Sequence, residues 1–443
     1  MTVQFSNNYN WEKQLGPLEY FSSPVYTRGS LFFKGEIDLM KFIRSMSSSF
    51  NYFHLLLSHF STDKKGNIWA CNSTKKINST TKEQLEIEYI NEPMESATFE
   101  NTLPKKTIKD VYKLGFAKDL NGMVMAAFKL TIFNDGFCIG YTVNHSFFDQ
   151  ASIYYYLKFL SQIYSNDGEN LTFLKPQIFD SQNFINNKVK FDGIINAREY
   201  GDSNFGFIFY TMSQKPSEGS IDINFFHNTT IGLKFDLEEI NKIKSKNSNY
   251  LSTNDIISAI VLKVLTLTEF LKDSDDFTLR YVCNVRKYLE KGEEAIGNFA
   301  HHCKMILKVK EIKESSILDL ANIDRKSILG IHGDDFKDSL NWYKYMQDEK
   351  EVALTYVGKP SFYSSRITNW TNFDYDAVQF DKVSPHSIKT PSLAGYGINT
   401  ITFTTEHGKK YFTTGVSIPI DCMEKLDNFG KTSKLFSIDN IFN

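Results

Sequence analysis

The feature that most constrains this fold is a pair of apolar strand-type segments that leads directly into an amphipathic helix. Residues 123–133 (MVMAAFKLTIF) and 136–144 (GFCIGYTVN) predict two strands, and the Asn134–Asp135 pair between them predicts a hairpin turn. Residues 149–164 place apolar side chains on one helical face, with Asp149 as the expected N-cap. Strands that alternate with such helices favour an α/β or α+β fold.

The rest of the chain repeats this mixed character without an internal repeat. Further strands are expected near residues 230–235, 277–285, 303–309, 399–405 and 410–418, and further helices near 237–245, 253–271, 319–329, 336–347 and after 421. Thr253 is the expected cap of the helix over 253–271. Residues 165–220 are polar and irregular. We therefore predict an N-terminal domain over residues 1–185, a crossover linker over 186–220 and a C-terminal domain over 221–443, with part of 360–400 crossing back to the first.

The sequence His145-Ser146-Phe147-Phe148-Asp149 lies where the second apolar strand gives way to the helix. An imidazole at such a junction suits general-base work, because its unperturbed pKa is about 6.5. Asp149 could cap the helix or pair with a basic residue, and it need not touch the imidazole. The alternative interpretation of the motif is a core histidine followed by a helix-capping aspartate.

The composition of the chain argues against several classes of binding partner. Lys and Arg number 50 against 52 Asp and Glu, and a net charge of −2 argues against broad binding to nucleic acid or to an anionic membrane. The five cysteines form no CxxC pair, which is typical of reduced thiols in a cytoplasmic protein. No apolar run predicts a membrane span. His301-His302 lacks partners at metal-ligand spacing, so we expect no metal.

HSFFD resembles the HxxxDG motif of the BAHD acyltransferases, whose relatives include chloramphenicol acetyltransferases and the condensation domains of peptide synthetases. Three further segments resemble that family in the same order: residues 251–255 (LSTND) its "STNDAL" helix, 283–286 (CNVR) with 297–298 (GN) its "NVR…GN" segment, and 367–370 (ITNW) its "ITSW" strand. There are two departures. Gln150 replaces the glycine of the motif, and residues 379–385 (QFDKVSP) replace the family's DFGWG loop.

The resemblance implies two chloramphenicol-acetyltransferase-like domains, each a mixed β-sheet flanked by helices, with a channel between them. It implies an O- or N-acyltransferase of secondary metabolism that moves an acyl group from acyl-CoA, its co-substrate, to a small-molecule acceptor. His145 would be the general base in a ternary-complex mechanism. The resemblance also implies a monomer without a permanently bound cofactor.

The same resemblance implies roles for other residues. Asp149 would pair with Arg286 in a structural salt bridge across the domain boundary. Thr368 and Trp370 would face the channel and donate hydrogen bonds to the oxyanion. Lys244, Lys246 and Ser252 would contact CoA. For each of these the alternative is an ordinary structural contact, with Trp370 as a core aromatic and the lysines as a solvated face.

Two other functions stay open at this point. One is a condensation-type enzyme that takes its acyl group from a carrier-protein thioester, although Asn144 stands where that family has the first histidine of HHxxxDG. The other is a non-catalytic member that binds a ligand or partner. The triplets that begin at Asn144 and Asn369 match glycosylation sequons, and we take them as chance matches within the strands of the expected site.

Overall fold

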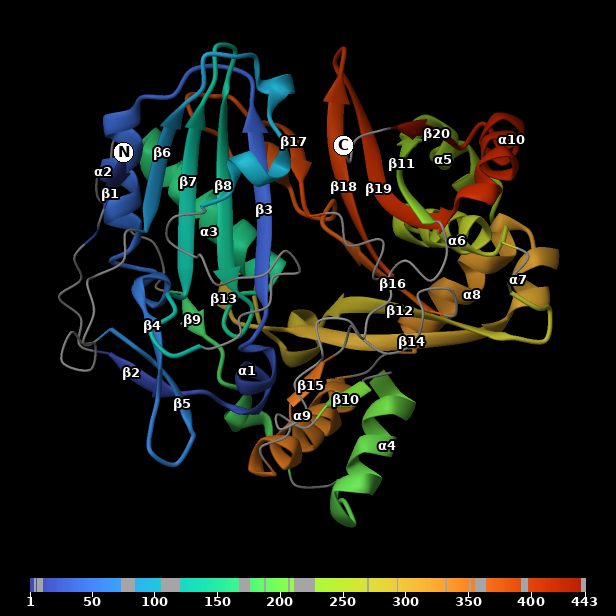
Figure 1. The fold of residues 1–443 in the computed structure, drawn as a ribbon, viewed down its shortest axis with the longest axis horizontal. Helices are drawn as coiled ribbons and strands as arrows, with labels where there is room; N and C mark the ends of the chain where they lie inside the picture. Colours follow the sequence, from blue (N-terminus) through green and yellow to red (C-terminus); the bar gives the residue numbers. More distant parts are fainter. Residues whose placement is uncertain are drawn as a thin grey trace. The chain divides into compact units, whose positions relative to one another are not determined.

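The chain forms two compact units in the computed structural model (Figure 1), which describes residues 1–3, 5, 11–72, 84–104, 120–166, 176–186, 189–205, 208–210, 228–268, 271–292, 294–330, 333–349, 352–354, 364–391 and 397–439. Unit 1 comprises Met1–Asn186, Arg286–Phe299 and Phe373–Pro391. Unit 2 comprises Asn187–Val285, Ala300–Asn372 and Ser392–Asn443. Each unit contains mixed β-sheet and flanking helices, which confirms the predicted fold class.

Two C-terminal segments therefore belong to unit 1. Phe373–Pro391 lies in the range that the sequence expected to cross back, whereas Arg286–Phe299 lies in the range assigned to the second domain. The expected linker, residues 186–220, falls only partly within the described residues. The channel between the domains stays a prediction.

The sheet of unit 1 runs in the order β1-β6-β7-β8-β3-β17. It is mixed, because β6 and β7 are parallel whereas the β7–β8, β8–β3 and β3–β17 pairs are antiparallel. The strands span Thr2–Val3 (β1), Leu85–Tyr89 (β6), Ala126–Ile132 (β7), Phe137–Asn144 (β8), Tyr26–Phe33 (β3) and Pro385–Lys389 (β17). A second small sheet is made of β2 (Glu12–Gln14), β5 (Ile68–Cys71) and β4 (His59–Thr62), and β9 (Gln177–Ile178) pairs with β13 (Ala295–Ile296).

The predicted hairpin and the helix after it form the centre of unit 1. Every residue of β3 and β8 is buried, as expected of interior strands covered on both faces. The helix α3 (Gln150–Ser165) begins after Asp149, whose side chain accepts a hydrogen bond from the Ser152 N–H. In Figure 1 this helix passes behind β7 and β8, and the rings of Phe128 in β7 and Tyr156 in α3 lie 5.4 Å apart.

The remaining helices of unit 1 are short, apart from α2. They are α1 (Pro17–Ser22) and α2 (Leu39–Ser49), with 3-10 turns η1 (His54–Leu57), η3 (Met94–Ser96), η4 (Phe99–Thr102), η5 (Ser181–Phe184), η6 (Arg286–Leu289) and η7 (Tyr375–Ala377).

The sheet of unit 2 has the order β18-β16-β12-β14, and β19 pairs with both β18 and β11, which in turn pairs with β20. The strands β18, β16 and β12 are parallel neighbours, whereas β12–β14 and the pairs through β19 are antiparallel. They span Asn228–Asp236 (β11), Asp276–Asn284 (β12), Ala300–Lys308 (β14), Ser364–Asn369 (β16), Ile398–Glu406 (β18), Lys409–Pro419 (β19) and Phe436–Asp439 (β20). A separate pair joins β10 (Ile208–Tyr210) to β15 (Val352–Leu354).

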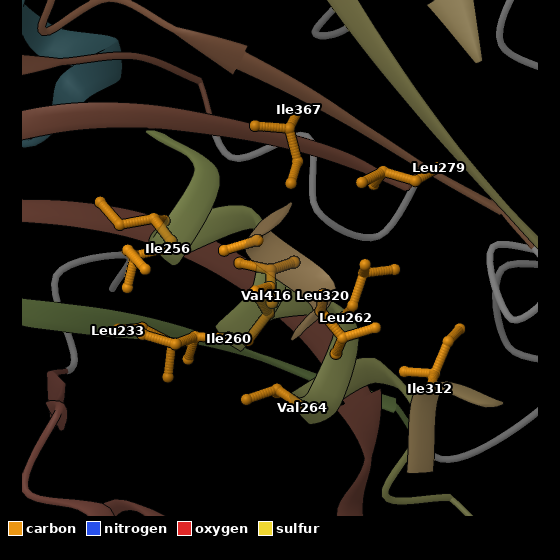
Figure 2. Close-up of a cluster of buried hydrophobic side chains, with 14 of the residues drawn as sticks. Leu233, Ile256, Ile260, Leu262, Val264, Leu279, Ile312, Leu320, Ile367 and Val416 are labelled. Atoms are coloured by element: carbon orange, nitrogen blue, oxygen red, sulfur yellow. The ribbon is translucent and has the colours of Figure 1, made fainter. Parts of the chain in front are cut away.

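Helix α6 (Thr253–Leu265) is the centre of the core of unit 2. Its residues 255–262 are all buried, so this helix is apolar on nearly every side. Figure 2 shows Ile256, Ile260 and Val264 of α6 among side chains from β11, β19 and α8. The other helices are α4 (Gly193–Phe205), α5 (Leu237–Lys244), α7 (Val309–Glu314), α8 (Ile317–Leu329), α9 (Gly333–Asp348) and α10 (Met423–Ser433), with the 3-10 turn η9 (Ile420–Cys422) before α10.

Candidate active site

His145 occupies the turn between β8 and α3, as the sequence predicted. Its backbone N–H donates to the Val25 carbonyl over 2.8 Å, and its side chain is half-buried. The preceding residue, Asn144, is fully buried, and its side chain forms hydrogen bonds with Ser146 in the turn and with Ser23 in a separate segment. Its Oδ1 accepts from the N–H and the hydroxyl of Ser146 over 2.9 and 2.6 Å, and its Nδ2 donates to the Ser23 carbonyl over 2.7 Å. The imidazole therefore sits on a closely held backbone.

Asp149 and Arg286 form a buried two-point ion pair. The Nη1 of Arg286 lies 2.7 Å from Oδ2 of Asp149, and its Nη2 lies 2.8 Å from Oδ1. The carboxylate also accepts from the backbone N–H groups of Ser152 and Phe299 over 2.8 and 3.1 Å. Burial by itself would raise the pKa of Asp149, but the Arg286 charge and these hydrogen bonds outweigh it, so its pKa lies below the usual range.

The partner of Arg286 is thus the one that the resemblance implied, but both residues belong to unit 1. The reason is that Arg286 begins the segment that returns to unit 1. Its guanidinium binds that segment as well, since Nε donates to the Ala295 carbonyl over 3.1 Å and Cζ lies 4.2 Å from the centre of the Phe299 ring. The ion pair therefore attaches residues 286–299 to the start of α3.

Two residues complete this attachment: Gly297 of the GN segment, and Ser152, which the sequence did not single out. The Ser152 hydroxyl accepts from Arg286 Nη2 over 2.8 Å and from the Gly297 N–H over 3.0 Å, and it donates to the Gly297 carbonyl over 2.9 Å. A Cβ at Gly297 would lie 2.3 Å from the Cβ of Phe179, so only glycine fits there without a shift of the backbone. A serine three residues after the motif aspartate was the available sequence signal.

Gln150, which replaces the glycine of the motif, has defined contacts in the structure. It is buried, and its Nε2 donates to the hydroxyls of Tyr141 and Tyr375 over 3.0 and 3.2 Å. The Tyr141 hydroxyl has room because residue 29 is glycine, where a Cβ would lie 2.2 Å from that oxygen. Gln150 thereby connects β8 and α3 to the returning segment Phe373–Pro391.

The segment that replaces the DFGWG loop forms a tight turn in that returning segment. The N–H groups of Phe380 and Val383 donate to each other's carbonyls over 3.1 and 2.9 Å. Asp381 and Lys382 between them both have positive φ, at 49° and 68°, as a type I′ turn requires. Phe380 is fully buried within 5.2–6.3 Å of four aromatic rings of unit 1, those of Phe33, Phe42, Phe137 and Tyr164. The retained phenylalanine is a packing residue.

The candidate oxyanion donors belong to unit 2. Thr368 lies in β16 and is half-buried, and Trp370 follows the end of that strand with 9% of its surface exposed. Among the residues that the structure describes, neither the Thr368 hydroxyl nor the Trp370 indole N–H has a hydrogen-bond partner. Asn369 between them accepts from the N–H and hydroxyl of Thr371, both over 2.7 Å, and donates to Asn254 Oδ1 over 3.1 Å.

The candidate CoA residues lie near the start of α6, also in unit 2. Ser252, not Thr253 as the sequence predicted, is the N-cap. Its hydroxyl accepts from the Asp255 N–H over 3.3 Å, while Asp255 Oδ2 accepts from the Ser252 N–H over 2.7 Å. Lys244 Nζ lies 3.4 Å from Thr253 Oγ1, whereas Lys246 is exposed. The serine hydroxyl retains its own proton for donation.

Two kinds of feature are absent from the described part of the chain. No group of three or more His, Cys, Asp or Glu side chains there could hold a metal ion. Over the same residues, no helix has the length and apolar character that crossing a membrane requires.

The chain is a mixed α/β protein of two compact units, and comparisons with known proteins give its family. The sequence matches the Transferase family over residues 77–428. The chain therefore belongs to that family, the BAHD-type acyltransferases. No curated protein matches it in sequence.

Solved structures share the fold at low sequence identity. F. graminearum TRI101 complexed with coenzyme A and T-2 mycotoxin has a TM-score of 0.73 at 12% identity, covering 97% of this chain and 99% of that one. Vinorine synthase has a TM-score of 0.63 at 14% identity, with 96% and 94% covered. The first condensation domain of the calcium-dependent antibiotic synthetase has a TM-score of 0.61 at 13% identity, with 96% of each chain covered.

Proposed function

We propose that this protein transfers an acyl group from acyl-CoA to a hydroxyl or amine of a small-molecule acceptor, with His145 as the general base. The proposal rests on two observations taken together. The His145 imidazole is half-buried on a turn that hydrogen bonds hold in place, and both carboxylate oxygens of the motif aspartate bind groups other than that imidazole. Both oxygens of Asp149 bind Arg286 and backbone N–H groups. Asp149 thus supports the turn mechanically, and His145 alone supplies the base.

The chemistry follows in two steps through a ternary complex. The Nε2 or Nδ1 lone pair of His145 takes the acceptor's proton as its oxygen or nitrogen attacks the thioester carbonyl. The carbonyl oxygen becomes an oxyanion, which the Thr368 hydroxyl and the Trp370 indole N–H stabilise by donation. When the intermediate collapses, the C–S bond breaks, and the imidazolium returns its proton to the CoA sulfur. No acyl-enzyme is required.

CoA brings phosphate groups, and Lys244 and Lys246 supply cations near the start of α6. The first turn of a helix favours anions. Asp255 opposes this, but Arg325 binds its Oδ2 over 2.6 and 2.8 Å and compensates its charge. The proposal therefore assigns the phosphates to the two lysines, with Ser252 as a hydroxyl donor beside them.

The similar structures support this choice of substrates. F. graminearum TRI101 has been crystallised with coenzyme A and T-2 mycotoxin, and with ethyl coenzyme A. By analogy we assign an acyl-CoA donor and a small-molecule acceptor, and the family resemblance adds a monomer as the working unit. The condensation-domain neighbour favours one second candidate, a carrier-protein thioester as the acyl donor.

The first test is a thermal-shift panel of CoA and short, long and aromatic acyl-CoAs on the wild type, followed by thiol release with candidate acceptors. We expect Tm shifts that depend on the acyl group, and thiol release that His145→Ala abolishes while the shifts persist. His407→Asn, an exposed turn substitution, is the matched control. Turnover by His145→Ala would remove His145 as the base. A panel without any shift, combined with transfer from a pantetheine-linked carrier protein, would replace acyl-CoA with the second donor.

A second test asks whether His145 and Trp370 act on the same transition state. Residues that act as a unit in catalysis show strongly non-additive losses. We expect Trp370→Phe to lower kcat with little change in CoA affinity, and the double variant with His145→Ala to lose little more than His145→Ala alone. Unchanged kcat in Trp370→Phe would contradict the oxyanion assignment.

A further inference from the structure

The two triplets Asn144-His145-Ser146 and Asn369-Trp370-Thr371 share one local structure, although they lie in different units. Each begins with an asparagine that is the last residue of a strand, β8 in unit 1 and β16 in unit 2. The middle residue of each is a candidate for the chemistry, as base or as oxyanion donor. The two Asn-x-Ser/Thr triplets thus coincide with one kind of local structure at the ends of two strands.

In unit 1, three contacts fix the residues on both sides of the imidazole. Asn144 Oδ1 accepts from the Ser146 N–H and hydroxyl over 2.9 and 2.6 Å, and Nδ2 donates to the Ser23 carbonyl over 2.7 Å. The His145 N–H donates to the Val25 carbonyl over 2.8 Å. Asn144 has no exposed surface.

In unit 2 the same contacts recur around the indole. Asn369 Oδ1 accepts from the Thr371 N–H and hydroxyl, each over 2.7 Å, and Nδ2 donates to Asn254 Oδ1 over 3.1 Å. The backbone N–H of Trp370 donates to the carbonyl of Ile401, in the neighbouring strand β18, over 2.9 Å. Each contact in one triplet has its counterpart in the other.

An asparagine side chain that accepts from the residue two positions on forms an Asx-turn, which substitutes for a backbone turn. Here the amide also donates outward, so a single side chain closes the turn and attaches it to a second segment. The backbone of the middle residue, already held by its own N–H, loses its freedom to tilt. Its ring then has only its side-chain torsions to adjust.

We propose that Asn144 and Asn369 are matched positioning residues that set the directions of the His145 imidazole and the Trp370 indole for transfer. This inference rests on the proposed function for the roles of the two rings. Neither asparagine touches the reacting atoms. Because a misplacement of about 1 Å can cost roughly 100-fold in rate, the loss of either turn should lower kcat rather than substrate affinity.

The donor side of each amide makes the two sites distinguishable. Asn144 Nδ2 faces the Ser23 backbone carbonyl, which can only accept a hydrogen bond. In Asn144→Asp a carboxylate oxygen would replace this donor, so two acceptors would face each other. Asn369 Nδ2 faces the side-chain amide of Asn254, which can turn over and donate to a carboxylate. Aspartate therefore preserves every contact of the triplet in unit 2 and destroys one in unit 1.

The experiment compares Ala and Asp variants at both positions with Asn399→Ala, a buried asparagine of β18 that binds Ser365 and flanks no candidate ring. We expect Asn144→Ala, Asn144→Asp and Asn369→Ala to lower kcat by about 10–100-fold with KM for acyl-CoA within about twofold. Asn369→Asp should stay within about threefold of the wild-type kcat. Asn399→Ala should lose stability but keep kcat within about twofold.

A spectroscopic measurement separates positioning from activity. The chain has 4 Trp and 9 His, so 5-fluorotryptophan and ¹⁵N-histidine labelling give resolvable spectra, assigned with Trp370→Phe and His145→Gln. Asn369→Ala should shift or broaden the Trp370 resonance, and Asn144→Ala the His145 resonances, while Asn399→Ala leaves both in place. Unchanged resonances, or kcat losses no larger than the control's, would overturn the inference. If the wild type transfers no acyl group from any donor, the proposed function fails, and the resonances still decide the positioning claim.

Discussion

The buried pair of Asp149 and Arg286 yields the sharpest prediction. Asp149→Asn keeps the shape of the side chain but removes the charge that faces a guanidinium with 4% of its surface exposed. Removal of one partner from a buried pair costs about 3–5 kcal/mol, because the remaining charge stays out of water uncompensated. For a domain of about 150–250 residues, each kcal/mol lowers Tm by about 2–4 °C. We expect Tm to fall by roughly 6–20 °C.

The matched control is Asp276→Asn, the same carboxylate-to-amide change at an exposed ion pair of unit 2. The Asp276 and Lys308 side chains are 58% and 56% exposed, and Lys308 keeps the Ser274 carbonyl as an acceptor over 3.2 Å. Exposed pairs contribute less than about 1 kcal/mol, so the control should lose only a few degrees. The double variant Asp149→Asn with Arg286→Gln should lose less than the sum of the single losses, because the unpaired charge is gone.

The pH dependence of this pair has a defined sign. The pKa of Asp149 is lowered in the folded protein, so its stabilisation is present above the pKa of the unfolded chain and disappears as pH falls through the folded value. Differential scanning fluorimetry between pH 3 and pH 8 should show the gap between wild type and Asp149→Asn closing only at the acid end. A variant with wild-type Tm and no transfer activity would refute the architectural role and place Asp149 in the chemistry.

Three further substitutions test other parts of the structure by chemical or thermal denaturation. Lys382→Gly should stabilise the protein by about 1 kcal/mol, since Lys382 has a φ of 68°, whereas Lys34→Gly should not; equal effects would contradict the strained turn. Gln150→Ala should cost about 1–3 kcal/mol, because it removes the hydrogen-bond partner of the buried Tyr141 hydroxyl. The exposed Gln379→Ala should cost little, and a neutral Gln150→Ala would refute the role of Gln150 as a bridge. Burial and a neighbouring carboxylate raise the pKa of Asp324 from 3.8 to about 8, so the stability of the wild type should fall as pH rises between those values. Asp324→Asn should remove this decrease in stability with pH, and a decrease that persists in the variant would show that Asp324 is not its cause.

Local patterning was sufficient for much of the fold. The hairpin β7–β8 could be predicted because short, continuous apolar runs on both sides of a turn indicate strands buried on both faces. The helix α3 could be predicted because its period-3.6 pattern reports which face is buried. The position of His145 between them followed from the same patterns. The start of α6 was misplaced by one residue at its cap, because Ser252 and Thr253 are both good caps and only the hydrogen bonds distinguish them.

The partners of the site residues depended on contacts between distant segments. The pairing of Asp149 with Arg286 spans 137 residues, and only the resemblance to a family suggested it. Three other features could not be predicted from the amino-acid sequence. They are the return of residues 286–299 to unit 1, the contact of Gln150 with Tyr375, and the equivalent turns at Asn144 and Asn369. Periodicity records which side of an element is buried, whereas the identity of what covers it is decided when remote segments pack together.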